Sequence, residues 1–404
     1  MNTLSQNEML IVSKYFNSII DYINIIKCCT EYNEILNLLN YNPIPLNEKI
    51  FKFFPNIQTY HIYDRRHFKD FDEYKKINKI IWYPVDYEDY LLSKDFMYKN
   101  IRLTVQDIDK YGIENIDFNV NIVELSNNCF EKCLNLRSIT LPDSVTKIDD
   151  YYFRNCSNLT NIVLSSNLKE IGSSCFEYCE SLMSIILPDS VTKLGNDCFW
   201  ACHNLKNITF STNLKEVGFS CCCGCSNLMS IVLPDSIIKI NDNCFDNCIN
   251  LRNIYLSSNL KEIGNGCFYK CLNLKEIIIP KNVTKIGFSC FYKCLNLKKI
   301  IIPENVIKIG ASCFNNCIML TKIKLPIKLK KLNRYCFNKC KSLRSITLPN
   351  SVTKLAECCF KGCENLRNIK LSDNLKEIDE NCFKNCINLK GNINIIDNNC
   401  FVKY

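Results

Sequence analysis

Cysteine is the residue type that could do the most chemistry in this chain, and its spacing is regular. The sequence has 29 Cys among 404 residues. The pentapeptide Cys129–Cys133, CFEKC, returns in nearly the same form every 23 residues, with its second Cys kept in all twelve copies and its Phe in eleven. Cysteines arranged in this way could form disulfides, bind a metal or act as nucleophiles, and each of these chemistries makes its own demands on spacing and partners.

Metal binding fits this pattern poorly. The two cysteines of each box are separated by three residues, whereas zinc sites favour Cys-x₂-Cys spacing, and the chain has only three His to complete a ligand set. Distance alone would allow disulfides, because stacked repeats about 4.8 Å apart place each Cys beside its counterpart in the next repeat. We predict reduced, buried thiols that act as small apolar wedges, with no metal and no cofactor.

Catalytic groups are sparse. The three histidines are His61, His67 and His203, and no phosphate-binding glycine motif occurs, so we interpret recurring Ile-Gly pairs such as Ile286-Gly287 as turn residues. The least regular box is Cys221–Cys225, CCCGC, where Cys replaces the Phe; repeat drift, a redox role and a metal role are the alternatives there. We predict that the chain is not an enzyme and has no small-molecule substrate.

The elements that would position these residues follow from the same period. Between boxes the apolar positions keep register, as at Leu136, Ile139 and Leu141, and a strict 23-residue period indicates units that must stack to bury their apolar faces. Each repeat predicts a short parallel strand over 136–141, a second extended piece over 145–148 and one helical turn at the box. The fold class expected is an α+β repeat: a solenoid of about twelve to thirteen units, capped by a small N-terminal helical region.

Three regions follow from the pattern along the chain. Residues 1–45 predict short helices, residues 46–106 an irregular α/β connecting region, and residues 107–404 the solenoid. Strands are expected near 57–63 and 80–83, with a charge-rich loop over 64–79 between them. A degenerate first unit is indicated by apolar residues 23 positions before those of the first full repeat: Ile113, Ile116, Phe118, Ile122 and Leu125.

The repeat resembles a known family. The strings L-R-S-I-T-L-P-D-S-V-T-K-I and C-F-x-x-C are similar to the BspA-type (Treponema pallidum type) leucine-rich repeat, with Cys at a box position where many members carry Ala. This resemblance implies a leucine-rich-repeat solenoid that serves as a binding scaffold. Bacterial members are often surface adhesins, and an adhesin would be expected to carry glycans at Asn158, Asn207 and Asn282, each in an N-x-[ST] sequon.

The N-terminal region carries a second, partial resemblance. Ser5-Gln6-Asn7-Glu8 reads as a capping box, and a third helix is expected over 32–39. The apolar order resembles an F-box, the motif that docks a substrate receptor onto the Skp-type adaptor of cullin ubiquitin ligases, with Ser5 where a Pro is usual. The alternative is a helical cap on the open end of the solenoid. The candidate adaptor-binding residues are Met9, Leu10, Val12, Tyr15, Phe16 and Ile23.

Charge points to a partner. The net charge is +9, and it comes wholly from the repeats, with 18 basic and three acidic residues between Lys261 and Arg344. One column alternates Lys and Glu from Lys147 onward, which predicts ion pairs between layers, and then becomes all Lys from Lys285 to Lys354. The candidate partner-binding residues are Lys275, Lys285, Lys298, Lys308, Lys331, Arg344 and Lys354.

Such a basic stripe suits an acidic protein or an anionic membrane surface, while no nucleic-acid recognition motif is present; the simpler alternative is a solvated face. The first residues lack a basic stretch typical of a secretion signal, and no apolar run is long enough to span a bilayer. We therefore expect a cytoplasmic protein, peripheral at the plasma membrane if the stripe meets lipid. The function expected is a protein-binding scaffold, with a ubiquitin-ligase substrate receptor and an adhesin as alternatives.

Overall fold

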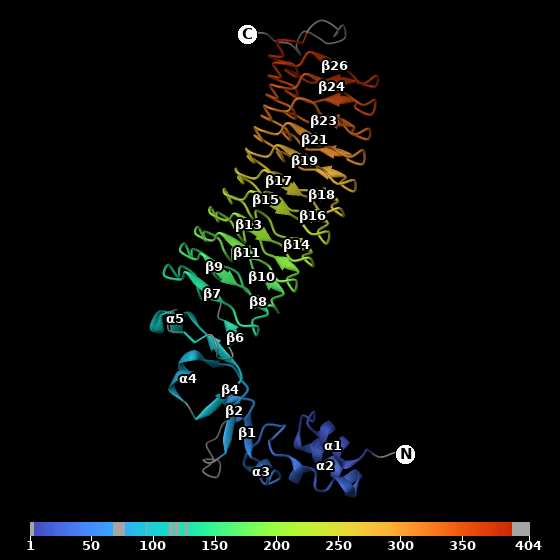
Figure 1. Ribbon diagram of the computed structural model, residues 1–404. Helices are drawn as coiled ribbons and strands as arrows, with labels where there is room; N and C mark the ends of the chain where they lie inside the picture. The colour runs from blue at the N-terminus through green and yellow to red at the C-terminus, as the bar shows by residue number, and fades with distance from the viewer. Residues whose placement is uncertain are drawn as a thin grey trace. The chain divides into compact units, whose positions relative to one another are not determined.

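The computed structural model describes residues 4–67, 77–93, 95–112, 116–117, 120, 122–125 and 128–389. The chain divides into two compact units, Met1–Ser126 and Asn127–Tyr404 (Figure 1). Residues 1–45 and 46–106, expected as separate regions, thus lie in one unit. Within the described residues, no helix is both long enough and apolar enough to cross a membrane.

The first unit begins with short helices. The Ser5 amide donates to the Glu8 carboxylate over 2.8 Å, and the Ser5 hydroxyl accepts from the Glu8 amide, which confirms the capping box. The third helix predicted over 32–39 is wrong, because the chain there forms two short 3₁₀ helices. The helices are α1 Gln6–Ser13, α2 Ile19–Cys28, α3 Glu48–Phe51, α4 Tyr87–Leu92 and α5 Val105–Tyr111, with 3₁₀ turns η1 Thr30–Tyr32, η2 Ile35–Leu38 and η3 Arg65–His67.

Two small parallel sheets complete this unit, and an aromatic contact joins α2 to the loop after α3. Tyr22 is fully buried and meets Phe54 edge-on with ring centres 5.9 Å apart, so residues 1–45 contact the region that follows them. Most of the loop expected over 64–79, together with Ile113 and Phe118, lies outside the described residues. The sheets are β1 Thr59–Ile62, β2 Asn78–Ile81 and β4 Phe96–Tyr98, and β3 Val85–Asp86, β5 Ile101–Leu103 and β6 Ile122–Leu125.

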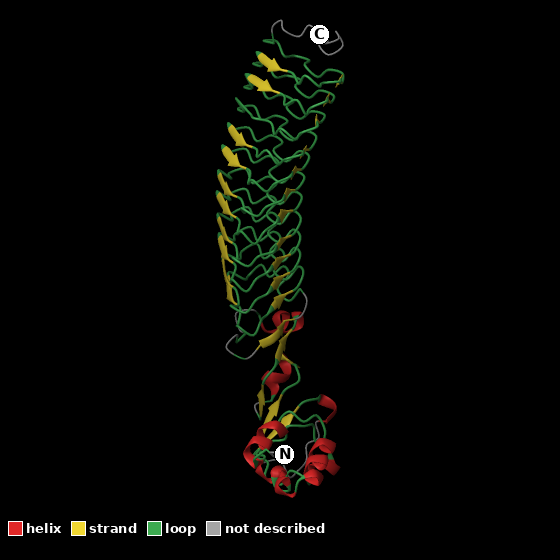
Figure 2. Ribbon diagram, turned by 90° about the vertical axis from the view of Figure 1, so that its right-hand side faces the viewer, coloured by secondary structure: helices red, strands yellow, loops and turns green. Residues whose placement is uncertain are grey.

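The second unit is the solenoid, which confirms the predicted fold. Each strand pairs in parallel with at least one strand 23 residues away, and the strands gather in two rows along the solenoid (Figure 2). The first-strand ladder holds β7 Ser138–Thr140, β9 Asn161–Val163, β11 Ser184–Ile186, β13 Asn207–Thr209, β15 Ser230–Val232, β17 Asn253–Tyr255, β19 Glu276–Ile278, β21 Lys299–Ile301, β24 Ser345–Thr347 and β26 Asn368–Lys370.

The second-strand ladder lies on the other row. Its strands have two residues each, the first exposed or half-buried and the second turned toward the core. They are β8 Lys147–Ile148, β10 Glu170–Ile171, β12 Lys193–Leu194, β14 Glu216–Val217, β16 Lys239–Ile240, β18 Glu262–Ile263, β20 Lys285–Ile286, β22 Lys308–Ile309, β23 Lys331–Leu332, β25 Lys354–Leu355 and β27 Glu377–Ile378.

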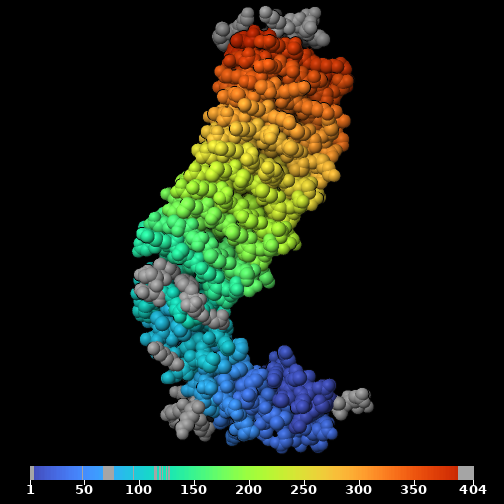
Figure 3. Space-filling view, in the orientation of Figure 1, coloured from blue at the N-terminus to red at the C-terminus, as the bar shows by residue number. Residues whose placement is uncertain are grey.

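Stacked phenylalanines form the axis of the solenoid core. Successive rings lie nearly parallel with centres 5.0 to 5.8 Å apart, in the offset range that aromatic rings favour. Cys222 interrupts the series, so that one stack runs from Phe130 to Phe199 and another from Phe245 to Phe383. In the space-filling view the layers form one continuous packed body (Figure 3).

The CFxxC box is a non-helical reversal, so the predicted helical turn is wrong. Each box closes two successive four-residue turns, as where the Cys156 amide donates to the Phe153 carbonyl. Its other amides bond to the next layer instead of continuing a helix, as from Phe153 to Cys175. Two residues per box, four positions apart, have left-handed backbone, for example Tyr151 and Asn155 at φ of 62° and 59°.

The second cysteine of the box is a hydrogen-bond donor, which corrects its prediction as an apolar wedge. Eleven of these thiols donate to the box carbonyl 26 residues earlier, at 2.9 to 3.2 Å, as from Cys156 to Phe130. The same carbonyl also accepts a backbone amide, as Phe130 does from Cys133. Alanine could replace the cysteine as a small buried side chain, but the carbonyl would then lose its bond from the thiol. The thiol therefore ties each box to the layer before it.

The residue after each second strand, where it is glycine or asparagine, forms a hydrogen bond to the preceding layer. Where this residue is glycine, close approach and not turn conformation explains it: a Cβ at Gly287 would lie 2.4 Å from the Gly264 carbonyl oxygen. The glycine amide donates to the preceding layer, as from Gly287 to Ile263. Where Asn241 takes this place, its side-chain Nδ2 donates to Val217 instead, and the strand ladder is interrupted there, between β14 and β16.

Candidate partner-binding surfaces

The seven basic residues predicted to bind a partner lie on two different ladders. Lys285, Lys308, Lys331 and Lys354 open consecutive second strands, β20, β22, β23 and β25. The remaining three directly precede first strands: Lys275, Lys298 and Arg344. Sequence reasoning joined them into one stripe, whereas the fold separates them into two groups, called below the second-strand lysines and the first-strand basic residues.

The second-strand lysines continue a column whose opposite charges lie in register. Glu170 lies in register with both Lys147 and Lys193 across the ladder, which confirms the predicted alternation of charge. The ion pair predicted between these layers is not formed by Lys147, whose Nζ lies beside Asp149 of its own layer. Further along, the ladder places Lys285 directly beside Lys308, and like charges in adjacent strands destabilise a sheet.

Only the ends of the lysine run are neutralised. Lys285 Nζ lies 2.7 Å from Glu262, and Lys354 Nζ lies 2.6 Å from Glu377. Lys308 and Lys331 make no ion pair with any part of the chain that the structure describes. The middle of the run therefore presents uncompensated positive charge.

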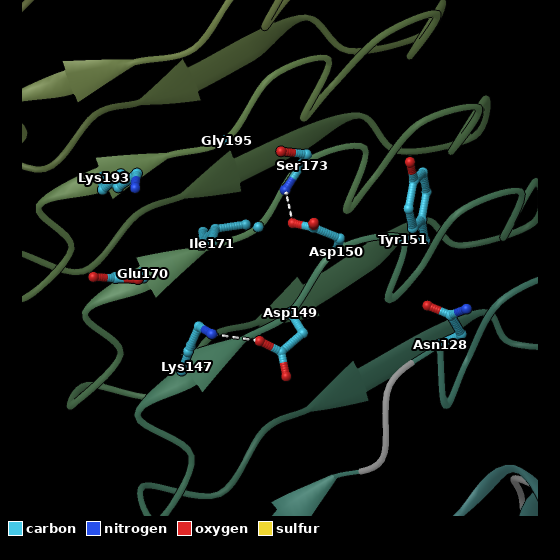
Figure 4. Close-up of a pocket in the computed structure, with 11 residues that line it drawn as sticks. Asn128, Lys147, Asp149, Asp150, Tyr151, Glu170, Ile171, Ser173, Lys193 and Gly195 are labelled. Atoms are coloured by element: carbon cyan, nitrogen blue, oxygen red, sulfur yellow. Dashed lines mark hydrogen bonds and ion pairs between the residues drawn. The ribbon is translucent and has the colours of Figure 1, made fainter.

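A shallow hollow of about 640 Å³ lies at the other end of the same ladder (Figure 4). Three of its charged groups are engaged locally: Lys147 Nζ lies 2.6 Å from Asp149, and Asp150 accepts the Ser173 amide over 2.5 Å. The dashed lines in Figure 4 mark these two contacts. Glu170 and Lys193 also line the hollow, so its charge is mixed, and it offers less to an anionic ligand than the lysine run does.

The first-strand basic residues flank apolar side chains that sequence reasoning missed. Lys275 and Lys298 are exposed in adjacent layers, with the Lys298 amide donating to the Lys275 carbonyl over 2.8 Å. Close by, Ile278 and Ile301 end their strands and are exposed by 65% and 44%. The signal was readable, because the residue at this register is apolar in most repeats, but only the fold shows that it faces solvent.

The histidines and the irregular box show local roles. His61 stacks on Tyr41 with ring centres 4.6 Å apart, and His203 Nδ1 lies 3.0 Å from the Gly224 carbonyl; the His67 side chain lies outside the described residues. Hydrogen bonds with Cys221 and Cys225, reinforced by burial, hold the pKa of the Cys222 thiol well above its usual range. A protonated, buried thiol is a poor nucleophile. Among the described residues, no group of three or more His, Cys, Asp and Glu is arranged to hold a metal ion.

The predicted adaptor-binding residues divide by exposure. Tyr15 and Val12 are exposed by 80% and 41%, whereas Met9 is buried. Leu10, Phe16 and Ile23 are half-buried. The asparagines at which an adhesin would carry glycans are exposed: Asn158, Asn207 and Asn282.

Comparison with known proteins places this architecture among leucine-rich repeats. A model of the BspA-type leucine-rich repeat region matches six copies, over residues 108–206, 192–320 and 284–404. A leucine-rich repeat protein from Bacteroides ovatus superposes with a TM-score of 0.59 and 29% identity, covering 78% of this chain and 82% of that one. A Treponema pallidum leucine-rich repeat protein is 30% identical over 44% of this chain and 78% of its own, with a TM-score of 0.36. No curated protein sequence matches.

Proposed function

This chain belongs to the BspA-type leucine-rich repeat family, and from that premise we propose that it is a non-enzymatic scaffold that binds an acidic partner protein along its solenoid. Solenoid layers hold their side chains in fixed columns, so a partner meets a rigid surface that loses little conformational entropy on binding. We place this binding in the cytoplasm, with an anionic membrane surface as the other target that a basic column suits.

The observation that carries the proposal is the run of second-strand lysines, whose middle members, Lys308 and Lys331, have no ion-pair partner among the described residues. Lys285 and Lys308 are neighbours across one ladder, and Lys331 and Lys354 across the next. Like charges in register cost stability, and the same column shows that alternating Glu would relieve that cost. Binding of an acidic partner surface would offset this repulsion between neighbouring lysines.

The test is mass spectrometry of the proteins that co-purify with the intact chain and with a variant in which all four second-strand lysines become Glu. We expect an acidic partner to disappear from the variant while its melting temperature stays close to that of the parent protein. The loss follows because each reversed charge turns an attraction into a repulsion at the interface.

A matched control makes the same change in charge elsewhere. The residues for it are exposed lysines scattered along the neighbouring column of the same unit: Lys169, Lys215, Lys330 and Lys376. This variant should keep the partner. If both variants retain the same proteins, the second-strand lysines are a solvated face and the proposal fails; if both lose them, only net charge matters.

A second candidate function, substrate receptor of a cullin-type ubiquitin ligase, is favoured by one specific observation. Helices α1 and α2 and the residues beside them expose large apolar side chains, which an adaptor would cover. They are Leu4, Ile11, Val12, Tyr15 and Ile20, exposed by 41% to 80%. Exposed apolar patches of this kind mark interaction sites more often than chance.

Tyr15→Asp tests this second function. Because Tyr15 is 80% exposed, the change should leave folding intact while placing a charge in an apolar interface. A Skp-type adaptor should co-purify with the parent protein and be lost from the variant. Co-purification without any adaptor would rule the receptor function out.

A further inference from the structure

The last residue of each first strand from β9 to β21 belongs to an exposed and mostly apolar column that runs over seven consecutive layers. Six of its members are apolar and 44% to 70% exposed, and the third member, Thr209, is the one polar residue. The members, called here the apolar column, are Val163, Ile186, Thr209, Val232, Tyr255, Ile278 and Ile301.

The apolar column is unusual because its side chains face solvent, where a sheet buried on one face normally carries polar residues. Each first strand buries its central residue and exposes the two beside it, and the exposed positions of such a sheet are normally polar. The other exposed column follows that rule, with Ser184, Asn207 and Ser230 in successive layers. Beyond Ile301 the same register also returns to polar residues, beginning with Lys324. The apolar stretch is therefore bounded, which is typical of a binding site.

A groove forms where the column carries its largest side chains. It measures about 610 Å³, and the side chains of Tyr255, Ile278 and Ile301 line it together with Pro280 and Pro303. Groove and column lie within the solenoid unit, so both are parts of one rigid stack. An apolar side chain of a partner could enter here and lose its contact with water.

Positive charge surrounds the groove. Lys281 lines it, and Lys275, Lys298 and Lys299 are exposed in the layers that carry Ile278 and Ile301. The acid beside them, Glu276, lies in register with Lys299. Charge complementarity therefore selects a partner that is acidic beside its apolar surface.

The spacing of the layers selects the partner's conformation. Paired strands lie about 4.8 Å apart, and an α-helix advances about 5.4 Å per turn, so a helix lying along the column sets one side chain over nearly every layer. Same-face side chains of an extended strand recur every 6.6 Å or so, out of step with the column. Seven layers, about 29 Å, match a helix of about 20 residues.

We propose that the apolar column and its groove bind one acidic amphipathic helix of a partner protein, lying along the solenoid axis. This rests on the proposed scaffold function and specifies its partner. The apolar face of the helix covers Tyr255 and Ile278, and its acidic flank meets Lys275 and Lys298.

The experiment measures fluorescence anisotropy of labelled synthetic peptides of about 20 residues with the full-length protein. One peptide carries Leu on one helical face and Glu elsewhere; a second has the same composition in scrambled order; a third carries Lys in place of Glu. The protein is compared with the double variant Tyr255→Ser/Ile278→Ser. A control variant, Phe219→Ser/Phe288→Ser, removes apolar side chains that are about half exposed and lie at another hollow, beside the second-strand ladder.

We expect the acidic amphipathic peptide to bind at least about ten-fold more tightly than either other peptide. The column variant should lose that difference and the control variant should keep it. Equal binding of the ordered and scrambled peptides, or no saturable binding of the acidic one, overturns the proposal. So does a dimer of the parent protein in sedimentation velocity that only the column variant abolishes, because a second copy would then be the occupant.

Failure here is distinguishable from failure of the scaffold function. If the second-strand lysine variant loses a co-purifying protein while the column variant keeps it, the scaffold function stands and the helix proposal falls. If neither variant loses any protein, both fall.

Discussion

Among single residues, Asp246 is a carboxyl group whose pKa is shifted by its surroundings far enough to test. Its side chain is half-buried in a box turn, and burial raises its pKa to about 6, against a smaller opposite effect of Lys270. One carboxylate oxygen, Oδ1, has no hydrogen-bond partner among the described residues. A carboxyl group kept partly from water and left unpaired favours its protonated form.

This shift predicts a dependence of stability on pH. Between the unfolded pKa of 3.8 and the folded value of about 6, the folded chain holds a proton that the unfolded chain has released. The stabilisation is therefore complete below the lower pKa and is lost as pH rises through the upper one. The loss amounts to about 1 to 2 kcal/mol, since water screens a half-buried group.

Asp246→Asn should remove this dependence, raising the melting temperature at pH 7.5 and changing it little at pH 4. Calorimetry over that range measures it. Asp235→Asn is the control of opposite sign, because a hydrogen bond from the Ser258 amide lowers the pKa of Asp235. Stability from Asp235 is present at neutral pH and lost as pH falls. Parallel curves for the parent protein and Asp246→Asn would contradict the assignment.

At the scale of elements, the second-strand ladder depends on the residue that follows each strand. Most layers close with a backbone amide, as from Gly264 to Ile240. Asn241 and Asn333 close theirs with side-chain Nδ2 groups, bonded to Val217 and Ile309. The ladder is interrupted at both places, so each break in the sheet coincides with a side-chain bond in place of a backbone bond.

Asn241→Asp should therefore destabilise the solenoid by about 1 to 3 kcal/mol, because the carbonyl of Val217 loses its donor and faces a carboxylate oxygen. Asn241→Gly should cost less, since glycine is what the neighbouring layers use and its own amide can close the bond. Urea denaturation of both variants measures the difference. Equal losses would show that the Nδ2 bond does not close this layer.

At the scale of the whole molecule, burial of the cysteine columns links solenoid integrity to thiol reactivity. Burial raises the pKa of Cys175 in the first column and of Cys271 and Cys317 in the second. A protonated thiol without access to solvent does not alkylate. The columns therefore report whether the layers around them are stacked.

We expect iodoacetamide at pH 8 to leave these column cysteines unmodified in the native protein and to label them after full denaturation. At intermediate denaturant, cysteines beside the Phe245–Phe383 stack should become labelled together, because repeats unfold with their neighbours and Cys222 separates this stack from the other. Mass spectrometry of tryptic peptides gives the extent at each site. The exposed Cys28 is the control for reagent activity. Rapid native labelling of Cys271 or Cys317 would contradict the packing.

The sequence by itself determined the solenoid, its strand register and its core. A 23-residue period with apolar residues at fixed positions allows one in-phase stacking, since a shift would set Phe153 against polar residues of the next layer. The alternation of Lys147 and Glu170 in one column could be predicted for the same reason. Family membership followed from this repeated pattern.

Only the tertiary structure decided which side chains share a face. Lys275 and Lys285 are ten residues apart in the chain, yet they belong to different ladders because the chain turns between its two strands. Exposure of the apolar column was hidden as well, since Ile277 and Ile278 are the same residue type and only the pleat buries one and exposes the other. The thiol bonds and the Asn241 bond arise between layers, and a sequence period records that layers stack but not which atoms meet.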